Sequence, residues 1–485
     1  MARLPAVHPR LRLPLRHEPR ARPDGEARRG RAARLRLGPR DARLAALLDG
    51  RRDPRPRQVV SPAVARQGRA GRRGLRSRRR PAFGGGGPAG VGPFHPGRAR
   101  RRGVSGIFIT GGTGYLGSYV LDELRRHPDA GRLFLLTRAK DAEEGTAKLW
   151  KALQLHLTAE QFYAFLDRVV FVPGDLSEPG LGISGEARAR LAEECDSVLH
   201  IAASLNRKSA KACVNANLRG SLSVVQLTRE LAEKRGGLRR FSFVSTTAVA
   251  GKREHQVVKE DEAIDWALSD YDPYARTKKF AEHMMRELLP DVPKTILRPP
   301  TVMGDSRFPQ TSQFEMVRIL NWMLDAPVVP CHPDTRLDFV PADFVGPSIA
   351  KLHLKDDVAH DCYQLSAGTG APTVREVKRA FDEAGIRTPK LAPKLYGAFD
   401  SLSNGLANGP RGAVSLYASL IKVFLPYFTN DVVFDNTRVV TELGEAPPRF
   451  TDYCVDLYRW SKSVGYEYPY APLPARPSKL PEAAE

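Results

Sequence analysis

Short apolar runs alternate with longer amphipathic stretches along the chain from Val104 onward. The runs are rich in β-branched and aromatic residues, as buried strands are, whereas the stretches between them repeat apolar positions with helical spacing. Strands that alternate with helices predict an α/β fold built on a doubly wound parallel sheet. We predict strands near residues 106–110, 132–137, 168–173, 197–201, 239–245, 294–298 and 361–366.

The first predicted strand runs directly into a glycine-rich turn, and an amphipathic helix is predicted after it, over residues 116–126. Such a turn needs the positive φ of glycine, and a phosphate approaches it closely only where no Cβ intervenes. The N–H groups and positive dipole end of the helix would face a pyrophosphate. Glycine-rich turns also occur without this function, but a strand before and a helix after favour a dinucleotide-binding Rossmann fold. The candidate cofactor-binding residues of the turn are Gly111, Thr113, Gly114, Tyr115, Leu116 and Gly117.

The end of the second predicted strand indicates which dinucleotide binds. An acidic residue at this point would hydrogen-bond the ribose 2′-hydroxyl of NAD. This strand instead ends in Arg138, with no carboxylate before Asp141. A guanidinium there can pair with the additional phosphate of NADP, helped by Lys140, although an exposed surface charge is the alternative interpretation. We therefore predict NADP(H) as the cofactor.

The length of the chain predicts more than one domain. We assign residues 104–300 to the NADP-binding domain, and within it the helical passage Ala142–Leu166 is longer than a simple crossover needs. The residues after Pro299 are too many for one last helix, so we predict a smaller substrate-binding subdomain over 301–385, at the carboxyl ends of the strands. Residues 386–485 are predicted as a C-terminal helical extension.

The charge of the chain is distributed very unevenly. The 485 residues carry a formal net charge of +22, which by itself suggests nucleic-acid binding. Residues 1–103 contain 29 Arg, no Lys and 6 acidic residues, so the rest of the chain is close to neutral. We predict that this Arg-rich segment is disordered, because it lacks the apolar periodicity of a folded core. Its composition is typical of GC-rich codons translated in the wrong frame or from too early a start; a basic binding tail is the second interpretation. We expect no nucleic-acid partner.

Cysteine usage and hydropathy predict a cytoplasmic protein. The five cysteines form no C-x-x-C pair and no spacing with histidine that suggests a metal, which favours a reducing compartment. No apolar h-region that would act as an export signal follows Met1. The most apolar stretch, Val414–Phe428, is interrupted by Lys422 and Pro426, so no transmembrane segment is predicted. Peripheral membrane contact stays open.

Tyr274 and Lys278 are the strongest catalytic candidates. Four residues apart on a helix, they share one face, and a nearby cation lowers the pKa of a phenol. Tyr274 can then give a proton to an oxygen that gains charge as hydride arrives, while Lys278 can hold the nicotinamide ribose. Thr246 follows a predicted buried strand and can bind the same oxyanion. The spacing recurs at Tyr458 and Lys462, without a comparable strand-end hydroxyl, and there we predict a packed helix with a solvated lysine.

In their order and spacing, these residues resemble the extended short-chain dehydrogenases/reductases over residues 104–380. Several segments are similar to the thioester reductase and fatty acyl-CoA reductase branch, which is male-sterility-like. The chain departs from the branch at Ile201, where a polar or small residue is expected, and after residue 386. The segments that carry the resemblance are Gly174–Ser177, Leu181–Ser184, His200–Asn206, Leu297–Arg307 and Asp338–Asp343.

The resemblance implies further cofactor-binding residues. Asn217 matches a helix asparagine of the family, although bracing a helix against the neighbouring strand explains it equally well. His200 is interpreted as a hydrogen-bonded strand-end histidine without a chemical role. Six residues are expected to line the cofactor cleft from the adenine to the nicotinamide: Asp175, Leu176, Ala202, Ala203, Pro299 and Val302.

By the same resemblance, the chain is expected to be an NADPH-dependent reductase of acyl thioesters, acting on acyl-CoA or an acyl carrier protein. The product would be an aldehyde, or an alcohol after a second hydride transfer, and no metal is expected. Leu416–Leu425 is apolar enough to cover an acyl chain or contact a bilayer, as well as to be an ordinary core helix. A ketoreductase, dehydrogenase or epimerase acting on hydroxysteroid, β-keto acid or nucleotide-sugar substrates is the first alternative. A non-catalytic NADP-binding regulator is the second, and Thr246, Tyr274 and Lys278 argue against it.

Overall fold

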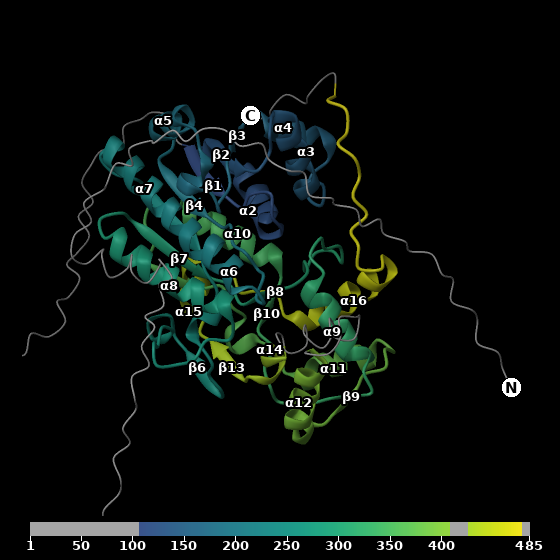
Figure 1. Ribbon diagram of the computed structural model, residues 1–485. Helices are drawn as coiled ribbons and strands as arrows, with labels where there is room; N and C mark the ends of the chain where they lie inside the picture. The colour runs from purple at the N-terminus through teal and green to yellow at the C-terminus, as the bar shows by residue number, and fades with distance from the viewer. Residues whose placement is uncertain (1–105, 408–424, 478–485) are drawn as a thin grey trace, which may run out of the picture. The chain divides into compact units, whose positions relative to one another are not determined.

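A parallel β-sheet forms the centre of the fold. The computed structural model describes residues 106–407 and 425–477, and within them seven strands form one sheet in the order β11-β7-β5-β4-β1-β2-β3 (Figure 1). The order runs outward from β1 and β4 in opposite directions, which confirms the predicted doubly wound α/β fold. Every predicted strand is present, with ends that differ by at most two residues. The strands are β1 (Gly106–Thr110), β2 (Arg132–Thr137), β3 (Val169–Pro173), β4 (Ser197–His200), β5 (Arg240–Val244), β7 (Lys294–Arg298) and β11 (Cys362–Gln364).

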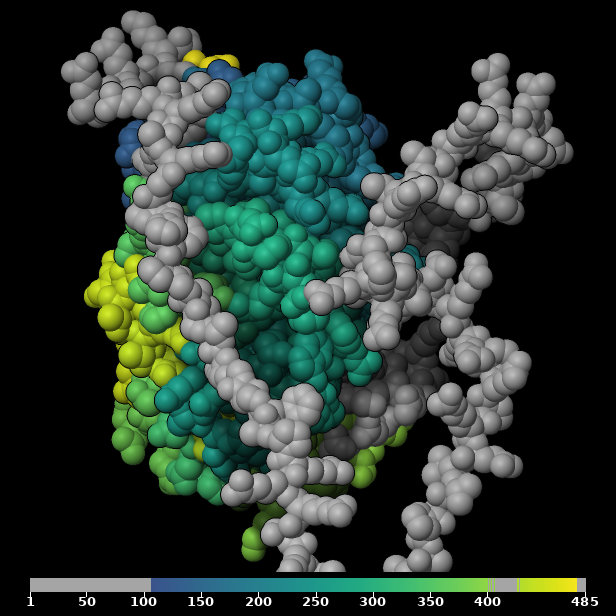
Figure 2. Space-filling model, turned by 90° about the vertical axis from the view of Figure 1, so that its left-hand side faces the viewer, coloured from purple at the N-terminus to yellow at the C-terminus, as the bar shows by residue number. Residues whose placement is uncertain are grey.

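Neighbouring residues of a strand point to opposite sides of the sheet. Because consecutive strand residues are apolar, both faces of the sheet are apolar. In β1, Ile107 and Ile109 pack into one hydrophobic core and Phe108 into the other, and all three are buried. One face is covered by α2 (Tyr115–Arg125), α3 (Ala142–Leu153), α4 (Ala159–Leu166), α10 (Ala342–Leu354) and α15 (Thr437–Leu443). The other face is covered by α5 (Gly185–Glu194), α7 (Ser221–Arg235) and α8 (Pro273–Leu288). These last helices form the teal and green surface that faces the viewer in Figure 2.

A separate hydrophobic core forms beyond β7. It contains buried residues of α9 (Glu315–Asp325), α11 (Val374–Glu383) and α16 (Cys454–Ser463), together with Phe339, Phe428 and Phe450. We call this the small core. Because α16 belongs to it, residues from both the predicted subdomain and the predicted C-terminal extension build one packed unit.

Among the described residues, three short parallel strand pairs lie outside the seven-stranded sheet. They are β8 (Thr301–Val302) with β10 (Phe339–Val340), β9 (Val328–Val329) with β12 (Lys390–Leu391), and β6 (Gln256–Val258) with β13 (Val432–Phe434). The extension from residue 386 therefore contains strands as well as α12 (Tyr396–Ala407), α14 (Pro426–Thr429), α15 and α16. The predicted C-terminal helical extension did not include β12 and β13, because their pairing partners lie far away in the sequence.

The end of the described chain returns to the main sheet's helices. The indole N–H of Trp150, in α3, donates to the carbonyl oxygen of Pro472 at 3.0 Å. The phenol of Tyr163, in α4, donates to the carbonyl oxygen of Pro474 at 2.6 Å. Figure 1 shows this yellow segment running from α16 to α3 and α4. The helical passage predicted over residues 142–166 is thus two helices, joined to the C-terminal segment.

Two predictions fall outside the part of the chain that the structure describes. They are the disordered segment 1–103 and nearly all of the apolar stretch Leu416–Leu425. In the ranges 106–407 and 425–477, no helix combines the length and hydropathy that crossing a membrane requires.

Candidate active site

A cavity of about 750 Å³ lies at the carboxyl ends of the sheet strands. Parallel strands end at the same edge of a sheet, so residues that follow different strands meet there. Of the predicted site residues, Asn217 and Lys140 do not line this cavity. The lining includes Gly111, Thr113, Gly114, Tyr115, Leu116, Gly117, Arg138, Asp175, Leu176, Ala202, Ala203, Thr246, Tyr274, Lys278, Pro299 and Val302.

The glycine turn between β1 and α2 leaves room where side chains would collide. Gly111 has a φ of 82°, and a Cβ on it would lie 2.6 Å from the backbone nitrogen of Ala202. A Cβ on Gly117 would lie 2.1 Å from the carbonyl oxygen of Gly111. Gly114 is the N-cap of α2 and no side chain caps the helix there, so N–H groups of the first turn lack side-chain partners. This turn fits a dinucleotide pyrophosphate.

Residues that follow β2 and β3 continue the cavity wall on the side of the glycine turn. Arg138 follows β2, is exposed and lines the cavity. Lys140 is not among the lining residues, and its backbone N–H donates to Glu144. Leu176, after β3, packs against Gly220, where a Cβ would lie 2.5 Å from its Cγ. Arg138 is therefore the cation that this end offers a ligand, and Asp175 is the carboxylate that lines the same end.

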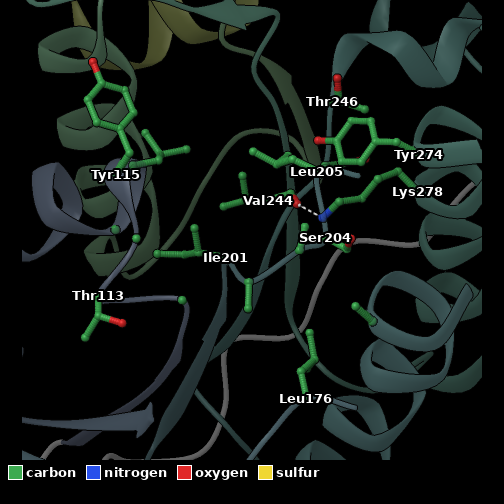
Figure 3. Close-up of a pocket in the computed structure, with 18 of the residues that line it drawn as sticks. Thr113, Tyr115, Leu176, Ile201, Ser204, Leu205, Val244, Thr246, Tyr274 and Lys278 are labelled. Carbon is green, nitrogen blue, oxygen red and sulfur yellow. Dashed lines mark hydrogen bonds between the residues drawn. The ribbon is translucent and has the colours of Figure 1, made fainter. Parts of the chain in front are cut away.

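The candidate catalytic residues lie across the cavity from the glycine turn. Figure 3 shows Thr246, Tyr274 and Lys278 together on one side, with Thr113 and Tyr115 on the other. Thr246 follows β5, while Tyr274 and Lys278 occupy the first two turns of α8. Asp272 fixes the start of this helix, because its carboxylate accepts a hydrogen bond from the N–H of Ala275 at 2.8 Å. The hydroxyls of Thr246 and Tyr274 are thus presented to one space.

Lys278 is buried and held by the backbone. Its Nζ donates to the carbonyl oxygen of Val244 at 2.7 Å, shown as a dashed line in Figure 3, and lies 4.4 Å from the ring centroid of Phe243. Its exposed fraction is 1%. Burial disfavours the ammonium and lowers the pKa of Lys278 to about 7.

The phenol of Tyr274 is also buried, and burial raises its pKa above the ordinary value. The guanidinium of Arg207 and a side-chain hydrogen bond with Thr246 act in the opposite direction. We expected a cation near Tyr274 to lower this pKa, with Lys278 as that cation. This expectation was wrong for the structure as it stands, because desolvation is the largest effect and the ammonium of Lys278 is directed to the backbone of β5.

Arg207 is the residue of this site that the sequence interpretation missed. Its Cζ lies 4.6 Å from the ring centroid of Tyr274, and its Nη1 pairs with Asp272 at 2.9 Å. It also lines the cavity. Arg207 comes from the irregular segment after β4, where no periodicity or motif spacing indicates which side chain reaches α8.

Asn217 and His200 make structural hydrogen bonds. Asn217 lies in a π-helical segment, Val214–Gly220. Its Oδ1 accepts from the N–H of Ser204 at 2.7 Å and its Nδ2 donates to Thr277 Oγ1 at 3.2 Å, so it joins the segment after β4 to α8. The ring nitrogens of His200 lie 2.6 Å from Thr110 Oγ1 and 2.9 Å from Ser221 Oγ. These contacts fit the bracing interpretation of Asn217 and the interpretation of His200 as a hydrogen-bonded strand-end histidine.

The second tyrosine and lysine lie away from the cavity, in α16. Neither Tyr458 nor Lys462 lines the cavity. Lys462 Nζ donates to the phenol oxygen of Tyr458 at 2.7 Å and pairs with Asp325 of α9. The packed helix is as predicted, but the lysine is bound to two partners and not simply solvated. Across the described ranges, no group of three or more His, Cys, Asp or Glu side chains could hold a metal.

Comparison with known proteins places this geometry among reductases. Residues 109–349 match the family described as "Male sterility protein". The "Fatty acyl-CoA reductase wat" of Drosophila melanogaster is 27% identical over 233 residues, which are 42% of this chain and 44% of that protein. The "Nonribosomal peptide synthetase asaC" of Aspergillus flavus is 28% identical over 259 residues, which are 51% of this chain and 24% of that protein. The chain thus spans less than half the length of either relative.

A solved structure of a reductase domain is similar to this chain over a longer part of its length. The terminal R domain from the myxalamid PKS-NRPS biosynthetic pathway has a TM-score of 0.64 and 26% identity, and the match covers 75% of this chain and 92% of that one. The fold, the glycine turn and the Thr246, Tyr274 and Lys278 arrangement define an extended short-chain dehydrogenase/reductase. Within that class, the chain is similar to the male-sterility-like branch, over the residues that match its family model and in the R domain structure.

Proposed function

We propose that this protein is an NADPH-dependent reductase of acyl thioesters, carried by coenzyme A or by an acyl carrier protein. The observation that supports it best is one cavity bordered by a pyrophosphate-type glycine turn on one side and by Thr246, Tyr274 and Lys278 on the other. The relatives named as a fatty acyl-CoA reductase and a nonribosomal peptide synthetase support a thioester as the substrate class.

The side chains of the cavity account for the proposed chemistry. NADPH, when bound, supplies hydride to the carbonyl carbon of the thioester. The hydroxyls of Thr246 and Tyr274 hydrogen-bond the carbonyl oxygen, and Tyr274 transfers its proton to it, which gives a hemithioacetal. The C–S bond then breaks, the proton moves to sulfur, and an aldehyde and a thiol leave. With a second NADPH, the same hydride and proton transfers to the aldehyde give an alcohol.

The remaining residues bind and orient. Lys278 lies one helical turn after Tyr274, where it can hold the nicotinamide ribose, and Arg138 can pair with the 2′-phosphate that distinguishes NADPH from NADH. The cysteines of the described chain are buried and unpaired, which supports the predicted cytoplasmic location.

Purified protein with reduced cofactor and a substrate panel tests this function. We expect oxidation of NADPH, faster than of NADH, with acyl-CoA or acyl-carrier-protein thioesters, and release of free thiol with aldehyde or alcohol. An acyl-length series would define the chain that is accepted. Oxidation with β-keto acids or ketosteroids but with no thioester would instead assign a ketoreductase. A Tyr274→Phe protein that binds NADPH and keeps its cellular role would indicate a regulator.

A further inference from the structure

Arg207 is the charged side chain that lies over the ring of Tyr274. Its Cζ is 4.6 Å from the ring centroid, within the range of a cation–π contact. The ion pair with Asp272 at 2.9 Å holds it there, and the two side chains are only 17% and 8% exposed. Asp272 in turn caps α8 two residues before Tyr274. Guanidinium, carboxylate and helix start therefore form one connected unit around the phenol.

Lys278 cannot serve Tyr274 in the same way in this structure. Its ammonium is bound to the carbonyl of Val244 and lies over the ring of Phe243. Burial also lowers its pKa to about 7, so this ammonium loses its proton far more readily than a guanidinium does. An arginine keeps its proton throughout the accessible pH range. The permanent cation next to Tyr274 is Arg207.

We propose that Arg207 is a positioning residue for Tyr274: its guanidinium holds the phenol ring in the cavity and stabilises the negative charge left on the phenol oxygen after proton transfer. This inference rests on the proposed function, since it requires Tyr274 to be the proton donor. The transfer is a single proton from the Tyr274 hydroxyl to the substrate oxygen, which already carries the electron pair delivered with hydride. Arg207 gains and loses nothing.

The other groups around Tyr274 determine the direction of each expected change. Asp272 and the thiol of Cys213 disfavour the phenolate, whereas Arg207 and the Thr246 hydrogen bond favour it. Lys278 follows one turn later on the same helix. Reduction needs the protonated phenol, so its rate falls as pH rises through the pKa of Tyr274 in the enzyme. Removing Arg207 raises that pKa, and neutralising Asp272 lowers it.

The test measures the pH dependence of kcat for thioester reduction in three variants. Arg207→Met should move the alkaline limb up by about one pH unit and lower kcat about tenfold, because the phenol becomes a weaker acid. Asp272→Asn should move the limb down, since asparagine still caps the helix but lacks the charge. Arg207→Lys should keep most of the wild-type profile. Both of the first two variants break the same ion pair, so a merely structural role would change them alike.

Arg276→Met is the matched control. Arg276 lies on the same helix and pairs with Asp270, but its side chain is 63% exposed. It should leave the profile unchanged. An unmoved limb in Arg207→Met, or limbs that move in the same direction in Arg207→Met and Asp272→Asn, would overturn the inference. Full reductase activity in Tyr274→Phe would also overturn it, because Tyr274 would not be the proton donor. If the wild-type protein reduces no thioester, the proposed function fails instead. Should Arg207→Met not fold, the opposite shift expected of Asp272→Asn still decides.

Discussion

The chain contains two tyrosine–lysine pairs with identical spacing, and their surroundings differ completely. In α8, Tyr274 and Lys278 line a cavity, and the lysine is bound to a backbone carbonyl. In α16, Lys462 bonds directly to the phenol of Tyr458 and to Asp325. Burial lowers the pKa of Lys462, but its hydrogen bonds to Asp325 and Tyr458 outweigh this and raise it. We therefore expect that a proton donor needs a shared cavity with a strand-end hydroxyl, rather than direct contact between phenol and ammonium.

Removing the two phenol oxygens separately gives the sharpest contrast. Tyr274→Phe should lower kcat for thioester reduction by about 10²- to 10⁴-fold, the usual contribution of a positioned general acid. Tyr458→Phe loses the hydrogen bonds of this phenol with Asp325 and Lys462, away from the cavity, and should keep wild-type kcat. Steady-state assays on both proteins, with circular dichroism as a folding check, measure the difference. Equal losses would mean that the two pairs are not functionally distinct.

The glycine turn lies across the cavity from Tyr274 and Lys278, and it can be altered without substituting either tyrosine. In Gly117→Ala, the added Cβ meets the carbonyl oxygen of Gly111 at 2.1 Å, so the turn must move. Such overpacking costs about 1–3 kcal/mol, which weakens NADPH binding roughly ten- to hundredfold if the strain falls on the bound state. Gly185→Ala is the control, because a Cβ there meets nothing within 4 Å. Fluorescence titration with NADPH compares the two, and unchanged affinity in Gly117→Ala would move the cofactor away from this turn.

The preference for NADPH over NADH tests whether the cavity that contains Tyr274 and Lys278 binds the 2′-phosphate of NADPH. Arg138→Gln should reduce the preference for NADPH over NADH by about tenfold, the effect of losing one charge-assisted hydrogen bond of about 1.4 kcal/mol. Arg132→Gln changes an arginine at the opposite end of β2, which pairs with Glu194, and should leave the preference unchanged. The ratio of kcat/KM for the two cofactors is the measurement. A preference that survives in Arg138→Gln would assign the phosphate to another group.

The two lysines should affect stability against pH differently. The pKa of Lys278 in the folded protein, about 7, lies below the unfolded value of about 10.4. Between these values the unfolded chain binds more protons, so the Lys278 contribution raises the free energy of unfolding as pH increases, by at most about 1.4 kcal/mol per pH unit. Lys462 has a raised pKa, so its contribution is constant until pH approaches the unfolded value.

Urea unfolding at pH 7 and pH 9 separates these cases. Wild-type protein and Lys462→Met should gain stability over this interval by the same amount, and Lys278→Met should gain less. A Lys278→Met protein with the full wild-type gain would show that Lys278 stays charged in the fold.

The sequence predicted most of the site because of a property of parallel sheets. Thr246, Arg138 and Ala202 each follow a strand, and every residue in that position reaches the same edge once the strand order is right. The glycine turn is equally local, since φ and steric demands fall on adjacent residues. Both kinds of prediction needed only the pattern along the chain.

What could not be predicted depends on contacts between distant segments. Arg207 reaches Tyr274 from an irregular segment, and the position of Asn217 is set by a π-helical turn that has no clear sequence signature. The sequence suggested Tyr274 and the nicotinamide ribose as partners of the Lys278 ammonium, whereas the packing of α8 against β5 gives it the carbonyl of Val244. The place of α16 in the small core likewise depends on two distant helices. They are α9, more than a hundred residues earlier in the chain, and α11, some seventy residues earlier.

The C-terminal segment has a practical consequence for anyone who shortens this protein. The family match ends at residue 349, yet β13 covers the side of β6, α16 fills the small core, and Pro472 and Pro474 tie the chain end to Trp150 and Tyr163. A version trimmed to the family boundary would present an uncovered strand edge and an opened apolar cluster to water, both of which promote aggregation. Recombinant versions should therefore extend to at least residue 477.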